Sequence, residues 1–189
     1  VRLPAVVIGG GLTAIDTATE LAAYYPIQVE KALGQYEALV EARGEADVRR
    51  QYDAEELMVL DEFCAHGRQV RAERARAAQA GELPNFIDLV RSWGGVTLAY
   101  RKRMVDSPAY RLNHEEVIKA LEEGIAFAEN LNPVEAVPDE FGAVQAMIFT
   151  REGRSQAGAG DAGAPPDQGP GTVTLPARTV LVAAGTSPN

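Results

Sequence analysis

The hydrophobic and polar positions at the start of the chain predict a strand, a turn and a helix in direct succession. Residues 6–8 form a short apolar run, three glycines follow, and residues 12–23 carry apolar side chains at helical spacing. A short apolar run bounded by turn residues is typical of a parallel strand that is buried on both faces. We therefore expect an α/β fold.

The pattern that follows is helical as far as Trp93. The residues here are mostly Ala, Glu, Arg, Gln and Leu, with few β-branched side chains. We expect the first helix to end at Tyr24-Tyr25-Pro26, because proline disfavours a helix interior. Further helices are expected over residues 27–40, from an N-cap at Asp53 through Val70, and over residues 84–93. Residues 26–93 are thus predicted to form an all-helical insertion.

Two features of this insertion have ordinary structural interpretations. The charge run over residues 71–76 has the spacing of a solvated helix surface, with opposite charges three and four residues apart. Cys64 is the single cysteine of the chain. Because it lies in a helical pattern, we expect it to be a small buried hydrophobe within a helix.

After Gly94 and Gly95 the pattern returns to strands. Strand-like runs are expected over residues 96–100, 125–128, 134–137, 143–150, 172–175 and 180–183, with one helix that starts at Asn113 or His114 and ends at Gly124. Residues 143–150 and 172–175 are expected to pair as an antiparallel β-hairpin. Residues 151–171 are rich in Gly, Ala, Pro and Ser, which predicts a flexible hairpin loop.

The predicted fold is a Rossmann-like central parallel sheet with flanking helices, a small antiparallel hairpin and the helical insertion. Residues 1–25 and 94–189 would form the Rossmann-like domain. The chain both begins and ends close to a core strand, which predicts a domain that belongs to a longer polypeptide. Its oligomeric state is left open by the sequence.

The composition of the chain argues against several classes of function. The chain has 189 residues, 46% hydrophobic and 24% charged, as in soluble globular proteins. No apolar run approaches the ~20 residues of a membrane span and no signal peptide is visible, so a cytoplasmic location is expected. A net charge of -9 argues against a nucleic-acid surface. No cysteine and histidine cluster has metal-ligand spacing, and no nucleophile or acid-base constellation is evident.

The glycine turn contains a motif for cofactor binding. Gly9-x-Gly11-x-x-Ala14 fits the dinucleotide-binding fingerprint in its Gly/Ala form. Gly9 allows the tight turn, Gly11 lets a pyrophosphate approach the backbone, and Ala14 lets the helix pack closely on the strand. The phosphates would lie at the helix N-terminus, where free N–H groups and the helix dipole favour negative charge.

Two residues compete to contact the adenosine ribose. Glu30 follows the glycines by about the usual twenty residues and would indicate NAD. Arg101 follows the predicted strand 96–100, and an arginine in that place accommodates the 2′-phosphate of NADP. Because the residues after Glu30 have helical period, we prefer Arg101, with Lys102 and Arg103 as its basic neighbours.

The combined motifs resemble those of the NADPH-binding domain of pyridine nucleotide-disulfide oxidoreductases, of the glutamate synthase small-subunit type. The resemblance covers about two thirds of the chain, on both sides of the insertion. The residues that carry it are Ile8-Gly9-Gly10-Gly11, Thr13-Ala14-Ile15-Asp16, Val96-Thr97-Leu98, Tyr100-Arg101, Ser107-Pro108-Ala109, Glu116-Val117, Glu122-Glu123-Gly124-Ile125, Pro133-Val134-Glu135, Leu175-Pro176-Ala177, Thr179-Val180-Leu181-Val182-Ala183, Gly185 and Pro188-Asn189.

The resemblance implies a cofactor and a partner domain. NADPH, in preference to NADH, would pass its hydride to FAD held by a FAD-binding domain of the same polypeptide, so the chain alone is expected to be inactive. The implied cofactor-binding residues are Gly9, Gly10, Gly11, Leu12, Thr13 and Ala14 at the pyrophosphate, Tyr100, Arg101, Lys102 and Arg103 at the 2′-phosphate end, and Ala184 and Gly185 near the nicotinamide half.

The chain departs from the family pattern at the insertion and at Leu12, where relatives often carry a polar residue. The insertion could cap the nucleotide cleft, dock another domain or block binding, so a degenerate Rossmann-like interaction module is the alternative function. Binding of FAD at the glycines is a weaker alternative, because a FAD ribose is usually met by an acidic side chain rather than by Arg101.

Overall fold

A computed structural model describes residues 1–151 and 171–185, so the predicted loop over residues 151–171 lies almost entirely outside the described residues. The chain divides into two compact units. One comprises Val1–Thr19 and Gly94–Asn189, which we call the sheet unit, and the other comprises Glu20–Trp93, which we call the helical unit. The boundary falls within α1 (Leu12–Arg43). Within the described ranges, no helix is long and apolar enough to cross a membrane.

The sheet unit is built on four parallel strands in the order β3-β2-β1-β7. These are β1 (Ala5–Ile8), β2 (Val96–Tyr100), β3 (Ala126–Glu129) and β7 (Thr179–Val182). The central strand β1 pairs with both β2 and β7, and Ala5, Val6 and Val7 are at most 1% exposed. Burial on both faces explains the unbroken apolar run in the sequence and confirms the predicted parallel sheet.

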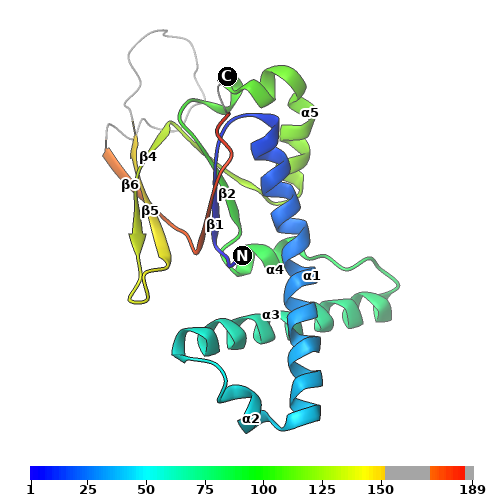
Figure 1. Cartoon of the computed structure of the whole chain (residues 1–189). Helices are drawn as coiled ribbons and strands as arrows, with labels where there is room; N and C mark the ends of the chain where they lie inside the picture. The colour runs from blue at the N-terminus through cyan, green and yellow to red at the C-terminus, as the bar shows by residue number, and fades with distance from the viewer. Residues whose placement is uncertain (152–170, 186–189) are drawn as a thin grey trace. The chain divides into compact units, whose positions relative to one another are not determined.

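A second, antiparallel sheet has the order β4-β5-β6. It comprises β4 (Leu131–Pro138), β5 (Val144–Arg151) and β6 (Gly171–Pro176). The predicted hairpin of β5 and β6 is confirmed, and β4 extends it to three strands. This sheet lies on one face of the parallel sheet, with α5 (Pro108–Glu122) on the other face (Figure 1). Phe149 and Met147 of β5 pack in one buried cluster with Val6 and Ala99 of the parallel strands.

Helix α5 starts earlier than the sequence pattern suggested. A first helical turn that the sequence pattern did not predict begins at Pro108, where Ser107 caps it by accepting a hydrogen bond from the N–H of Tyr110 at 3.1 Å. Asn113 then interrupts the helix with a non-helical φ of -157°, and a second helical segment follows it, as the expected start at Asn113 or His114 predicted. The end at Gly124 is confirmed: the Ile125 N–H donates to the Ala120 carbonyl at 2.9 Å, as in a Schellman motif.

The helical unit contains most of α1, with α2 (Glu45–Arg49), α3 (Ala54–Ala80) and α4 (Ile87–Ser92). The expected break at Pro26 is wrong, since α1 runs through it as one helix. An interior proline costs about 3 kcal/mol, and burial of Tyr25, Val29 and Leu33 along the same helix offsets that cost. The N-cap at Asp53 is confirmed by a full capping box with Glu56, whereas the last predicted helix is shorter than expected.

Cys64 is buried in α3, as expected, in a cluster with Leu33, Tyr36 and Val48. Burial raises the pKa of its thiol. The thiol is therefore kept in the less reactive protonated form.

The charge run in α3 forms ion pairs along the surface of the helical unit. Arg76 pairs with Glu73 at 2.7 Å, three residues away, as the spacing predicted. Arg74 instead reaches across to Glu30 of α1 at 3.0 Å, and Arg71 reaches Glu37 at 2.8 Å. Two of these exposed pairs join α1 to α3, and each contributes little stability individually.

A glycine in α3 permits the close crossing of α1 and α3, and its replacement should weaken the helical unit. A Cβ on Gly67 would lie 2.6 Å from the Val29 carbonyl oxygen, whereas one on Gly34 would meet only the Arg71 guanidinium at 3.6 Å. Gly67→Ala should therefore lower the free energy of unfolding by about 1–2 kcal/mol. Gly34→Ala, the matched control, should raise it by up to about 1 kcal/mol because alanine favours a helix. Urea denaturation followed by circular dichroism measures both, and similar effects of the two changes would contradict this packing.

His66 should make the helical unit sensitive to mild acid. Its Nδ1 lies 2.8 Å from the Tyr25 hydroxyl, and its ring stacks on Trp93 at 4.3 Å. Burial lowers the pKa of His66 below its usual value of 6.5, with the charge of Glu62 opposing the shift. The folded state therefore favours the neutral ring, so the contribution of His66 to stability is complete above pH 6.5 and is lost as the pH falls from there through the lowered pKa.

Thermal unfolding at about pH 7.5 and about pH 5.5 tests this. It can be followed by the fluorescence of Trp93, the only tryptophan of the chain. The melting temperature should fall with acid in the wild type, and less so in His66→Gln. An equal fall in both proteins would show that His66 does not cause it.

Candidate nucleotide-binding site

Four parallel strands end at the same edge of the sheet unit, and the predicted site residues follow them. The glycine turn follows β1, residues 101–103 follow β2, and residues 183–185 follow β7. The carboxyl edge of a parallel sheet is where α/β proteins bind their ligands. The structure therefore brings the predicted glycines and the predicted basic residues to one edge.

Gly9 makes the turn at the end of β1 tight. Its N–H donates to the Ala99 carbonyl at 3.1 Å, which continues the β1–β2 ladder by one residue. A Cβ added to Gly9 would lie 2.5 Å from the Ala183 carbonyl oxygen and 2.8 Å from the Ala14 Cβ. Ala14 is fully buried. The first glycine and the alanine of the fingerprint thus serve close packing, as the fingerprint assigns to them.

Gly10 connects the turn to β2 and to α5. A Cβ on Gly10 would overlap the Tyr100 ring, so that ring lies directly against the turn. The Gly10 carbonyl accepts a hydrogen bond from the Ala109 N–H at 3.0 Å. Because the next peptide is planar and trans, the Gly11 N–H points away from that contact. Ala109 is a contact that the sequence reasoning missed, although Ser107-Pro108 carried the signal of a helix start.

Gly11 stands at the open N-terminus of α1. A Cβ there would have no neighbour within 4 Å. Its carbonyl accepts from the Ala14 and Ile15 N–H groups, which makes Gly11 the N-cap. The N–H groups of residues 10–13 have no acceptor among the described residues, and the first turn of α1 holds no acidic side chain. This combination of free donors, a positive dipole end and open space suits a phosphate group.

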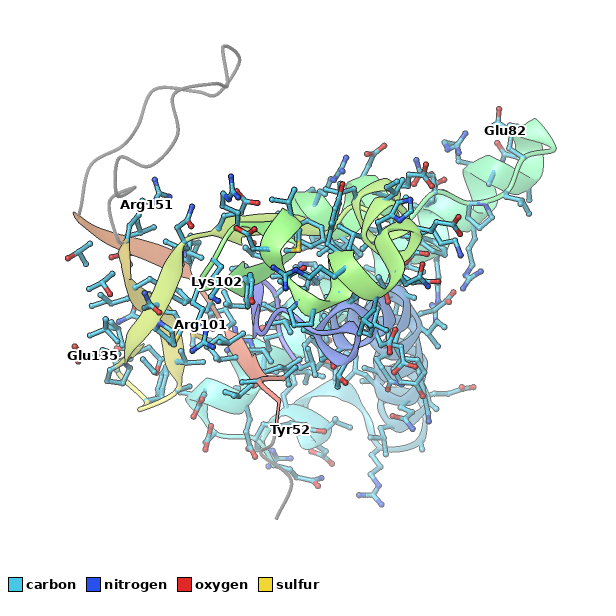
Figure 2. The ribbon with its side chains drawn as sticks, turned by 90° about the horizontal axis from the view of Figure 1, so that it is seen from above. Tyr52, Glu82, Arg101, Lys102, Glu135 and Arg151 are labelled. Carbon is cyan, nitrogen blue, oxygen red and sulfur yellow. The ribbon has the colours of Figure 1, made fainter. Side chains whose placement is uncertain are left out.

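Three basic side chains follow β2, all of them exposed. Figure 2 labels Arg101 and Lys102, and neither has an ion-pair partner in the described part of the chain. Arg103 instead pairs with Asp106 at 2.8 Å. That hydrogen bond holds the pKa of the Asp106 carboxyl below its usual range, with the charges of Arg103, Arg111 and Lys102 acting in the same direction. Arg101 and Lys102 are thus the cations available to an added anion.

The loop that carries these cations is fixed by the end of β3. The Met104 N–H donates to Oε1 of Glu129 at 2.6 Å, and the Asn130 N–H donates to the Lys102 carbonyl at 3.2 Å. Sequence reasoning did not identify Glu129 as part of the site. The pairing of Tyr100 with Glu129 across β2 and β3 brings it there.

The remaining predicted positions lie as follows. Ala184 and Gly185 are exposed beyond the end of β7, and a Cβ on Gly185 would have no neighbour within 4 Å. Glu30 lies on α1, not on a strand, and pairs with Arg74, so its rejection as the ribose ligand is consistent with the fold. Across residues 1–151 and 171–185, no group of three or more His, Cys, Asp or Glu side chains could hold a metal ion.

Comparisons with known proteins add little information about the function of this chain. No protein-family model matches the chain. Uncharacterized protein RP006 of Rickettsia prowazekii (strain Madrid E) is 36% identical over 150 residues, which is 79% of this chain and 19% of that protein. The chain therefore spans about a fifth of the length of the curated relative that it matches.

Among solved structures, the chain is similar to FprA of Mycobacterium tuberculosis. The His57Gln mutant matches with a TM-score of 0.41 and 17% identity, over 94% of this chain and 38% of that chain. FprA in complex with NADPH matches with a TM-score of 0.40, 17% identity and the same coverage. At this level the likeness is distant, and the fold of this chain rests on its own strand order and register.

Proposed function

We propose that this chain is the nicotinamide-nucleotide-binding domain, with a preference for NADPH, of a FAD-dependent oxidoreductase. The proposal rests on two features that lie at the same edge of the parallel sheet. The open, amide-lined N-terminus of α1 lies after β1, and Arg101 and Lys102, which have no ion-pair partner among the described residues, lie after the adjacent strand β2. A dinucleotide has phosphates at matching places, the pyrophosphate and the ribose 2′-phosphate.

The residues present fit this cofactor. The N–H groups of residues 10–13, which have no acceptor in the described part of the chain, can donate to pyrophosphate oxygens, and Gly11 leaves the space for their approach. Arg101 and Lys102 would neutralise the 2′-phosphate, which NADH lacks. The ring of Tyr100 lies directly against Gly10 of the turn.

When bound, NADPH supplies the hydride for reduction of a flavin. The part of this chain is to bind and orient the nucleotide, through backbone amides, glycines and the cations Arg101 and Lys102. Ala184 and Gly185 would lie near the nicotinamide half of the cofactor. The flavin would be held by a FAD-binding domain of the same polypeptide, which is the partner this proposal requires.

Calorimetric titration of the chain with NADPH and with NADH tests the proposal. We expect saturable binding of NADPH, with weaker binding of NADH. If neither nucleotide binds a chain that is folded by circular dichroism, the proposal is wrong.

A second candidate function is an interaction module. The helical unit has its own core and exposes the neighbouring apolar side chains Tyr24 and Ile27 on α1, at 59% and 48%. In this view the helical unit docks a domain or a subunit. Deletion of residues 26–95 from the whole protein separates the alternatives. Loss of the protein's assembly would support a docking role for the helical unit. A change in NADPH affinity with intact assembly would indicate a lid.

A further inference from the structure

The loop that leaves β2 is held at two points by the end of β3. Asn130, with a left-handed φ of 57°, donates its N–H to the Lys102 carbonyl. Glu129 accepts the Met104 N–H at 2.6 Å, a short hydrogen bond to a charged acceptor. These two contacts anchor the backbone of residues 102–104, directly after Arg101, to the end of β3.

We infer that Glu129 is a positioning residue for nucleotide specificity, which it exerts by holding the loop of residues 101–104 so that Arg101 and Lys102 meet a 2′-phosphate. This inference rests on the proposed function. An acidic side chain at the end of β2 would favour NAD by accepting the ribose hydroxyls. Glu129 lies one strand away, at the end of β3, and its Oε1 is occupied by a backbone N–H. Its carboxylate thus supports a site for NADPH from the adjacent strand.

The same carboxylate could instead act by its charge, and the two roles predict different behaviour of conservative variants. A positioning role needs only an acceptor oxygen, so Glu129→Gln should preserve it and Glu129→Ala should abolish it. A charge role would oppose the 2′-phosphate, so both changes would then strengthen NADPH binding alike. The glutamine variant therefore separates position from charge.

The experiment compares wild type, Glu129→Gln and Glu129→Ala in two measurements. Glu135→Ala is the matched control, because Glu135 is an exposed glutamate on β4 of the same unit. Hydrogen exchange of the Met104 amide, measured by NMR without nucleotide, reports on the loop. The ratio of the dissociation constants for NADH and NADPH reports on specificity.

We expect Glu129→Ala to speed exchange at Met104 and to lower the ratio about tenfold, which corresponds to ordering about one backbone residue on binding. Glu129→Gln and Glu135→Ala should keep the ratio within about twofold of wild type. An unchanged ratio in Glu129→Ala, or equal strengthening of NADPH binding in both Glu129 variants, would overturn the inference.

Failure of the proposed function gives a different result. In that case the wild type binds neither nucleotide, and the specificity role of Glu129 is overturned with it. Exchange at Met104 would still distinguish the variants, since the hydrogen bond to Glu129 does not depend on a ligand. If the wild type binds NADPH and Glu129→Ala leaves the ratio of dissociation constants unchanged, the inference about Glu129 is wrong and the proposed function stands.

Discussion

Gly9→Ala should destabilise the sheet unit by about 3 kcal/mol, the upper part of the usual range for overpacking. The added methyl group would lie 2.5 Å from the Ala183 carbonyl oxygen and 2.8 Å from the buried Cβ of Ala14. Neither neighbour can rotate away: Ala183 is held by the hydrogen bond of its N–H to the Ile8 carbonyl at 2.8 Å. The strain must therefore be taken up by the ends of β1 and β7.

Gly11→Ala is the matched change, and it should weaken nucleotide binding while it leaves stability nearly unchanged. Its methyl group would have no neighbour within 4 Å, and its backbone is outside the left-handed region, so stability should change by no more than about 1 kcal/mol. Binding of NADPH should weaken at least about tenfold, because the methyl group would stand between the phosphates and the helix amides. Urea denaturation and calorimetric titration measure the two effects. Unchanged NADPH affinity in a stable Gly11→Ala protein would place the phosphates elsewhere.

Arg101→Ala should weaken NADPH binding by about tenfold or more and leave NADH binding within about twofold, because a charged hydrogen bond to phosphate is worth about 1.5–3 kcal/mol. The effect should be specific, since Arg101 has no ion-pair partner among the described residues whose loss would disturb the fold. Added salt should shrink the difference, because Arg101 is exposed.

Arg91→Ala is the control for this change. Arg91 is an exposed arginine on α4 of the helical unit, so its removal subtracts the same charge from the chain. It should leave the affinities for both nucleotides unchanged. Equal weakening of NADPH and NADH by Arg101→Ala would indicate a contact to the shared pyrophosphate rather than to the 2′-phosphate.

The elements that the sequence predicted well are those whose signal is local. The run of residues 6–8 is apolar because β1 is buried on both faces, and the glycines at 94 and 95 adopt positive φ before β2. The capping box of Asp53 is also a local pattern of four residues. In each case one short stretch of chain contains the physical cause.

The errors and omissions have a common cause in tertiary contacts. Pro26 reads as a helix end, but α1 continues through it because its neighbours bury apolar surface that no local rule counts. The first turn of α5 contacts the glycine turn through the Ala109 N–H and the Gly10 carbonyl, and the Ser107-Pro108 start signal does not reveal that contact. Glu129 joins the site only because β3 lies beside β2 in the sheet. Strand order is a property of the whole fold, so this contact could not be predicted from spacing.

The most direct test of the proposed nucleotide site is an NMR titration of the isotope-labelled chain with NADPH, in which backbone amide signals report the place of binding. We expect the largest shifts at Gly11, Leu12 and Thr13 and at Arg101 and Lys102, and we expect NADH to reproduce the first group but not the second. Large shifts confined to the helical unit, or no shifts at the glycine turn at saturation, would contradict it.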